Sequence, residues 1–134
     1  MFELHPRLAA DTFAVAELPL CSVRLMNEAA LPWLILVPRR ADLREFTDLP
    51  QEERHRLMDE ICLASEVLQK LFAPDKINVG ALGNLVPQLH IHVQARSSAD
   101  RCWPGPVWGR FPAIPYDDAA RLERLAALQE AFAP

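Results

Sequence analysis

The stretch Pro87-Gln88-Leu89-His90-Ile91-His92-Val93-Gln94-Ala95-Arg96 decides the fold, because its apolar and polar residues alternate strictly. A period of two residues is typical of a half-buried strand, whose side chains point alternately to opposite faces of a sheet. One face is expected to pack on a core through Leu89, Ile91, Val93 and Ala95. The other face carries two imidazoles, two amides and a guanidinium, from Gln88, His90, His92, Gln94 and Arg96.

His90 and His92 are neighbours on the polar face, with Cα atoms roughly 7 Å apart at a rise of about 3.4 Å per residue. Two imidazoles at this spacing can reach one small anion, one attacking it and the other donating a hydrogen bond. Three interpretations are open: hydrogen-bonded histidines on a solvated face, two metal ligands, or a nucleophile that attacks phosphorus. No Asp, Glu or Cys near the pair offers a third ligand, which argues against a metal site.

The composition indicates an ordinary globular domain. The 134 residues are 51% hydrophobic and 24% charged, which predicts one domain over residues 1–134. A net charge of −4 gives no electrostatic footprint for nucleic acid. Three cysteines, odd in number and widely spaced, fit reduced thiols in a cytoplasmic protein. No signal peptide is expected at the N-terminus, and the apolar run 34–37 is too short to span a membrane.

Periodicity along the whole chain predicts five strands, the motif strand included, and two helices. Strands are expected at Thr12–Leu18, Leu20–Met26, Trp33–Val37, Lys76–Leu82 and Leu89–Ala95. Apolar residues at helical spacing predict an amphipathic helix of about six turns, at Leu57, Ile61, Ala64, Leu68 and Leu71. Asp48 with Gln51 resembles a capping box for this helix, and Pro50 is tolerated in its first turn.

The ends of the chain are less regular. Residues 1–10 are expected to form a short helical or irregular lead-in. Ser97–Pro115 is rich in Pro, Gly and Trp and is predicted to be an ordered loop packed on another part of the molecule. Asp117 can cap a final helix. The predicted fold class is therefore α+β: a five-stranded, mainly antiparallel sheet with one long central helix and a C-terminal helix.

The string from Gln88 to Gln94 resembles the motif of the histidine triad (HIT) superfamily, His-φ-His-φ-His-φ-φ, in which φ is apolar. The second and third histidines are present, and glutamine stands at the first position. The preceding segment 83–87 and the closing Arg96 are also similar to that family. The order of predicted elements matches the HIT fold, so the resemblance covers most of the chain.

The resemblance implies roles for three motif residues. His90 matches the histidine that attacks an α-phosphate and forms a covalent nucleotidyl-histidine. His92 matches the histidine that helps to bind the phosphate. Gln88 stands where a histidine joins the hydrogen-bond network behind the nucleophile; glutamine can donate and accept but cannot carry a proton. The implied activity is that of a nucleotide phosphohydrolase or nucleotidyl transferase. The alternative is a non-catalytic module that binds a nucleotide or another phosphorylated ligand.

Five further residues are candidates for substrate binding by resemblance, each with an alternative role. Asn84 matches an amide near the phosphates, and its alternative is a turn residue. Asn78 also matches an amide near the phosphates, and its alternative is a solvent-facing amide on a strand. Asn27 matches a ribose contact, or belongs to a simple turn. Arg96 can hold a phosphate or a carboxylate of the chain bidentately, or form a surface salt bridge. Trp103 matches a tryptophan that reaches the active site of a neighbouring subunit, or packs on its own sheet.

The segment Pro32–Ala41 only echoes the family pattern, because it keeps neither histidine of that pattern and lacks one residue. The resemblance is therefore to a divergent member of the family at best. Trp33 and Leu34 can line a base pocket, although core packing is the default for apolar residues. The resemblance further implies a homodimer, a small nucleotide as ligand and no required cofactor. A divalent cation can accompany a polyphosphate substrate.

Overall fold

Five antiparallel strands form one sheet in the order β1-β2-β3-β5-β4. The computed structural model describes all residues from Met1 to Pro134. The strands are β1 (Thr12–Glu17), β2 (Cys21–Met26), β3 (Trp33–Pro38), β4 (Lys76–Gly80) and β5 (Ile91–Arg96). The predicted five-stranded antiparallel sheet is confirmed.

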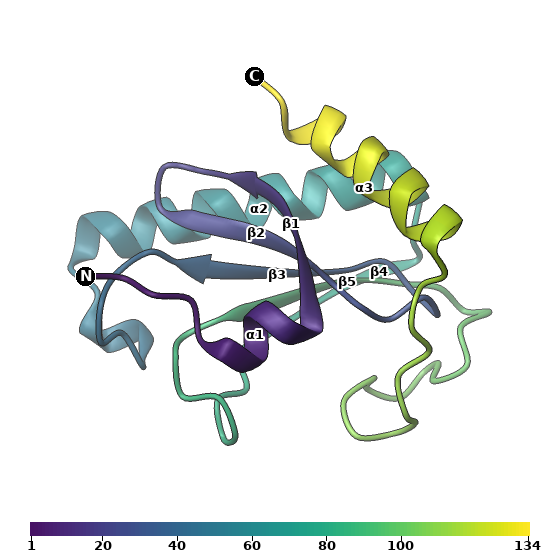
Figure 1. Ribbon diagram of the computed structural model, residues 1–134, viewed down its shortest axis with the longest axis horizontal. Helices are drawn as coiled ribbons and strands as arrows, with labels where there is room; N and C mark the ends of the chain where they lie inside the picture. The colour runs from purple at the N-terminus through teal and green to yellow at the C-terminus, as the bar shows by residue number, and fades with distance from the viewer.

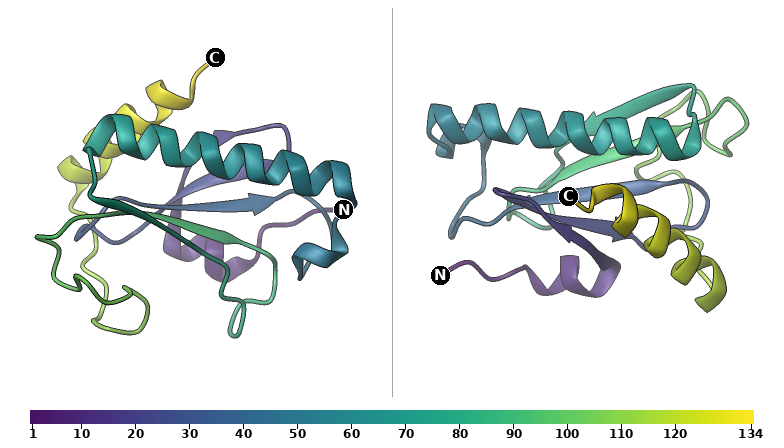
Figure 2. Two further views of the ribbon diagram at one scale, coloured as in Figure 1. Left: turned by 180° about the vertical axis from the view of Figure 1, so that it is seen from behind. Right: turned by 90° about the horizontal axis from the view of Figure 1, so that it is seen from above.

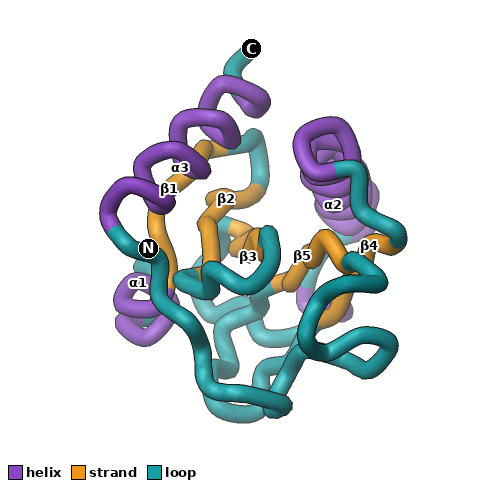
Figure 3. Tube along the Cα trace, turned by 90° about the vertical axis from the view of Figure 1, so that its right-hand side faces the viewer, coloured by secondary structure: helices purple, strands orange, loops and turns teal.

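The helices lie on both faces of this sheet. They are α1 (Pro6–Asp11), α2 (Gln51–Phe72) and α3 (Asp118–Phe132), with a short 3₁₀ helix, η1 (Phe46–Asp48), before α2. Figures 1 and 2 show α2 and α3 on one face and α1 on the other. Figure 3 shows the same layers along the strands, with the long loops gathered on the side of α1. No helix has the length and apolar character needed to cross a membrane.

Three sequence predictions of local structure were wrong. Asp48 does not cap α2, whose first turn follows Pro50 with no side-chain cap. Its Oδ2 instead accepts from the backbone N–H of Arg44 and Glu45, at 3.2 and 2.9 Å, and closes the turn around η1. The fifth strand begins at Ile91 and not at Leu89, because the N–H of Leu89 donates to the carbonyl of Leu43 outside the sheet. The fourth strand likewise stops at Gly80, which leaves residues 81–90 as a loop.

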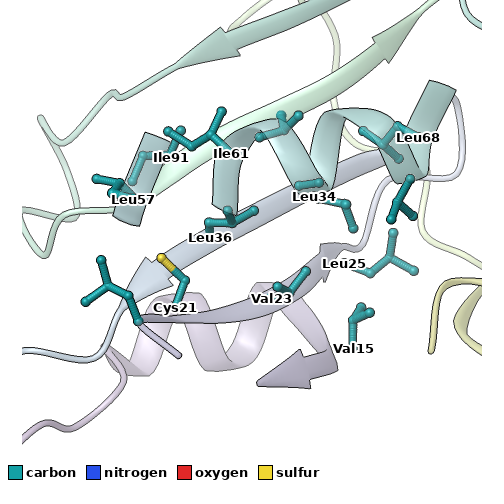
Figure 4. Close-up of a cluster of buried hydrophobic side chains, with 14 of the residues drawn as sticks. Val15, Cys21, Val23, Leu25, Leu34, Leu36, Leu57, Ile61, Leu68 and Ile91 are labelled. Atoms are coloured by element: carbon teal, nitrogen blue, oxygen red, sulfur yellow. The ribbon is translucent and has the colours of Figure 1, made fainter. Parts of the chain in front are cut away.

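The main core lies between the sheet and helices α2 and α3. It contains 19 buried residues, including Leu89, Ile91, Val93 and Ala95, the predicted apolar face of the motif. Figure 4 shows Ile91 between Leu57 and Ile61 of α2, above Leu36 of β3. Burial of each such side chain contributes about 1.5–3 kcal/mol to the free energy of unfolding, so the alternation fixes which face of β5 turns inward.

The opposite face of the sheet is also covered, by a second core drawn from α1, β3 and the loops after β4 and β5. Its members are Leu8, Leu31, Trp33, Ile35, Val37, Val86, Cys102 and Val107. The polar face of the motif therefore lies inside the molecule: His90 is 5% exposed, His92 7%, Gln94 0% and Arg96 1%. The reading of two imidazoles on a solvated face is wrong, because the long loops fold over them.

Candidate functional site

The position of the ring proton of His90 follows from its surroundings. His90 lies at the end of the 81–90 loop, directly before β5. Its Nδ1 is 2.7 Å from the backbone carbonyl oxygen of Gln88. A carbonyl oxygen only accepts, so Nδ1 carries the proton and donates it. A neutral His90 then has its lone pair on Nε2, which is the form required of a nucleophile.

His92 is held in the opposite tautomer. The indole N–H of Trp33 donates to Nδ1 of His92 at 2.9 Å, across the β3–β5 pair. An indole nitrogen only donates, so a neutral His92 carries its proton on Nε2. Burial, followed by the nearby His90, lowers the pKa of His92 to about 4. His92 is therefore neutral at pH 7 and presents an N–H donor.

The two rings lie side by side, with centroids 5.0 Å apart and planes inclined by 69°. The site thus combines a lone pair on one imidazole with an N–H donor on the next. Nε2 of His90 can attack an electrophilic phosphorus while Nε2–H of His92 donates to one of the phosphoryl oxygens.

An apolar cleft of about 330 Å³ opens beside both histidines. Its apolar walls come from Leu8, Met26, Ile35, Leu85, Val86 and Trp108. The Trp108 ring packs edge-on against His92, with centroids 5.5 Å apart. Arg7 and Asp11 of α1 stand at the rim as an exposed ion pair, with Nε and Oδ2 3.6 Å apart. The cleft has the lining expected for a flat apolar group attached to a polar one.

A second cleft, of about 240 Å³ and more polar, also reaches His90. It lies between the segment 44–46 and the loop 81–90, and its polar side chains are Arg44, Glu45, Asn84 and Gln88. Asn84 lines both clefts. His90 therefore stands where an apolar and a polar cleft meet.

A family model described as the HIT domain matches residues 7–99. The chain belongs to the HIT family. It is similar to a histidine triad protein from Marinobacter aquaeolei VT8, with 50% identity over 98% of this chain and 96% of that one and a TM-score of 0.95. It is also similar to a histidine triad protein from Bradyrhizobium japonicum, with 42% identity over 98% of both chains and the same TM-score. No curated protein matches the chain.

Of the residues predicted for the HIT site, the structure brings His90, His92 and Asn84 together at the clefts. Gln88 lines the polar cleft, but its side chain binds elsewhere. The amide Nε2 donates to the carbonyl of Glu3 and Oε1 accepts from the N–H of His5, both at 2.8 Å. Only the backbone of Gln88 contacts the ring of His90.

Three other predicted residues form a separate cluster. The guanidinium of Arg96 binds Asp100 through two nitrogens, at 2.8 and 3.1 Å, and donates to Asn78 at 2.8 Å and to the carbonyl of Gly105. It also lies over the ring of Trp103, 5.8 Å from the centroid. Of the alternatives for Arg96, the structure selects the chain carboxylate. Arg96, Asn78 and Trp103 anchor the loop after β5 and line neither cleft.

Asn27 has a structural partner as well. Its Oδ1 accepts from the backbone N–H of Tyr116 at 2.9 Å, which fastens the segment before α3 to the β2–β3 connection. The protein has no group of three or more His, Cys, Asp or Glu residues arranged to hold a metal ion.

The sequence reasoning missed most of the lining of the apolar cleft, including Trp108 and Asp11. Trp108 comes from the predicted ordered loop, but nothing in that irregular segment indicates which tryptophan reaches the histidines. Asp11 ends a helix of six residues, too short for its polar face to be recognised by periodicity. Trp33 does not line either cleft, and its indole N–H donates to Nδ1 of His92.

Proposed function

We propose that this HIT-family chain is an enzyme that cleaves a phosphoanhydride or phosphoramidate bond at the α-phosphate of a nucleotide. The observation that carries the proposal is the pair of opposite tautomers at His90 and His92. It gives a nucleophilic nitrogen and a neutral hydrogen-bond donor at adjacent positions. The apolar cleft suits the nucleoside and the polar cleft suits the departing group.

The reaction proceeds in two steps. Nε2 of His90 attacks phosphorus, the bond to the leaving group breaks, and the leaving group takes a proton from water. The positive charge on the ring is stabilised by the bond from Nδ1 to the carbonyl of Gln88. Nε2–H of His92 donates to a non-bridging oxygen. Water then attacks the nucleotidyl-histidine, which releases a nucleoside monophosphate and restores His90. No cofactor takes part, although a divalent cation can accompany a polyphosphate substrate.

The test is a turnover panel of ADP, diadenosine polyphosphates and an adenosine phosphoramidate with wild type, His90→Ala and His55→Ala. His55 lies exposed on α2 and is the matched control. Wild type and His55→Ala are expected to hydrolyse at least one substrate, and His90→Ala to lose at least about 10³-fold in turnover. Intact mass after rapid denaturation without acid should rise by one nucleotidyl group in wild type and His55→Ala, and should stay unchanged in His90→Ala. Unchanged turnover in His90→Ala contradicts the assignment.

The second candidate function is a nucleotide-binding module without turnover. It is favoured by one observation: the residue at the first motif position has its side-chain amide occupied by Glu3 and His5 and cannot carry a proton. A rise in Tm with AMP, without hydrolysis of any substrate in the panel, supports this candidate.

We further propose that the protein is a homodimer and works in the cytoplasm. The dimer is what the HIT resemblance implies. The three cysteines are free, and two of them, Cys21 and Cys102, are buried, which suits a reducing compartment.

A further inference from the structure

The side chain of Gln88 joins the motif to the beginning of the chain. Residues 1–5 lead into α1 (Figure 1), and Gln88 binds this segment through both atoms of its amide. Nε2 donates to the carbonyl of Glu3 and Oε1 accepts from the N–H of His5, each at 2.8 Å. Donor and acceptor of one amide thus bind two backbone groups two residues apart, as a neighbouring strand would.

The residue that Gln88 holds is also the residue that starts α1. Nδ1 of His5 accepts from the backbone N–H of Arg7 at 3.1 Å and caps the helix. A helix of six residues is not stable by itself and depends on such anchors and on packing. Leu8, which is 5% exposed, is its one buried residue.

The same helix forms a wall of the apolar cleft beside the two histidines. It contributes Leu8 to the apolar lining and Arg7 and Asp11 to the rim. A connected series of contacts therefore runs from Gln88 through His5 to the wall against which the nucleoside would bind.

We propose that Gln88 is a positioning residue whose side chain holds α1 in place as the wall of the nucleoside cleft. Its backbone carbonyl serves His90 independently. This inference rests on the proposed function for its link to substrate, and it assigns Gln88 to substrate affinity and not to proton transfer. Glutamine suits this role because one side chain can donate to a carbonyl and accept from an N–H at once.

The experiment compares Gln88→Leu with wild type and with Gln129→Leu, a matched change at an exposed position of α3. Leucine keeps the size and the backbone carbonyl but loses both side-chain hydrogen bonds. We expect amide exchange at His5 to become about tenfold faster, and the Kd for AMP and the KM for the turned-over nucleotide to rise about tenfold. The effect should fall on KM and spare kcat.

Gln88→Glu separates the two hydrogen bonds. Glutamate still accepts from the N–H of His5 but cannot donate to the carbonyl of Glu3, so its effect on exchange and Kd should lie between those of wild type and Gln88→Leu. Gln129→Leu should match wild type in every measurement.

Two outcomes overturn the inference. One is a fall in kcat for Gln88→Leu with unchanged KM and unchanged exchange at His5, which would place the side chain in the chemical step. The other is faster exchange at His5 without weaker AMP binding, which would break the link to the cleft. If no nucleotide is turned over, the enzyme proposal fails, while exchange and the Kd for AMP still decide the role of Gln88.

Discussion

The tautomers at this site are fixed by two hydrogen bonds. One partner can only accept a hydrogen bond, and the other can only donate one. A backbone carbonyl accepts from His90, and an indole N–H donates to His92. Two chemically equivalent side chains, separated by one residue, thereby carry their protons on different ring nitrogens. The choice of tautomer needs no neighbouring carboxylate. The carbonyl determines which nitrogen of His90 carries the proton, and the indole does the same for His92.

The buried state of His92 predicts a pH dependence of stability. Its pKa is about 4 in the folded protein against 6.5 as a free side chain. Between these values the unfolded chain binds a proton that the folded chain does not, so the free energy of unfolding falls as the pH drops through this window. The loss reaches at most about 3 kcal/mol at pH 4 and is absent above about pH 6.5. Urea unfolding of wild type from pH 7 to pH 4.5 measures it.

His92→Asn should flatten that dependence, whereas His55→Asn, at an exposed position of α2, should leave it as in wild type. The titration of Asp100 does not overlap with this pH window. The hydrogen bond from Arg96 is the main cause that lowers its pKa from 3.8 to about 2, so its stabilising contribution is lost only below about pH 3.8. Equal slopes in wild type and His92→Asn would contradict the prediction.

At the scale of elements, the loop after β5 is held by one buried ion pair. The side chains of Arg96 and Asp100 are 2% and 7% exposed, and Asp100 also accepts from the backbone of Ser97, Cys102 and Trp103. This loop carries Trp108 to the histidines. The ion pair therefore sets the position of a cleft wall from a distance.

Arg96→Met should destabilise the fold by about 3–5 kcal/mol, because it leaves the carboxylate of Asp100 buried without its cation. The same variant should weaken AMP binding, since the loop that carries Trp108 loses its anchor. Chemical unfolding and calorimetry measure the two effects. Arg54→Met, at an exposed position of α2, is the control and should change neither. Stability within 1 kcal/mol of wild type would show that the loop is held by other contacts.

The elements that can be predicted from the sequence are those whose apolar residues form the main core. Alternation in β5 and the helical spacing in α2 describe surfaces that meet under α2, so both elements are where they were expected. The strand ends at Gly80 and Ile91 were missed, because pairing stops where the loop 81–90 leaves the sheet. Periodicity does not describe the second core, since loops without a repeat supply much of it.

The site was predictable only to the extent that it lies within one motif. His90 and His92 are two residues apart at the start of β5, one directly before the strand and one within it, and their pattern identifies them. Whether Arg96 binds a phosphate or a carboxylate cannot be predicted without the position of Asp100. The contact of Trp33 with His92 likewise cannot be predicted without the register of β3 and β5. Trp108 and Asp11 come from segments that only the folded chain brings together.

At the scale of the whole molecule, the edge at β4 offers a surface for a second copy. The other edge strand, β1, packs against α3. Val79 on β4 pairs with the buried Val93 and so faces α2, yet it is 49% exposed. The carboxylate of Glu60 accepts from the backbone N–H groups of Leu20 and Cys21. The side of α2 that carries Glu60 therefore faces β1 and β2.

Met58 precedes Glu60 by two residues, about 200° around the helix, and therefore lies on the flank toward β4. Figure 3 shows α2 above this end of the sheet. Met58 is 57% exposed, so the edge strand and the helix above it each present an exposed apolar side chain. Such a surface is suited to a two-fold contact in which strands and helices of two copies meet.

We expect a molar mass of twice 15.1 kDa at micromolar concentration, measured by light scattering after size exclusion. The double variant Val79→Glu with Met58→Glu should shift the protein to the monomer, because each copy would place two buried carboxylates against the same pair in its partner. Leu122→Glu, on α3 and 61% exposed in the monomer, is the matched control and should remain dimeric. A monomeric wild type would contradict the dimer, and a dimeric double variant would place the contact on another face.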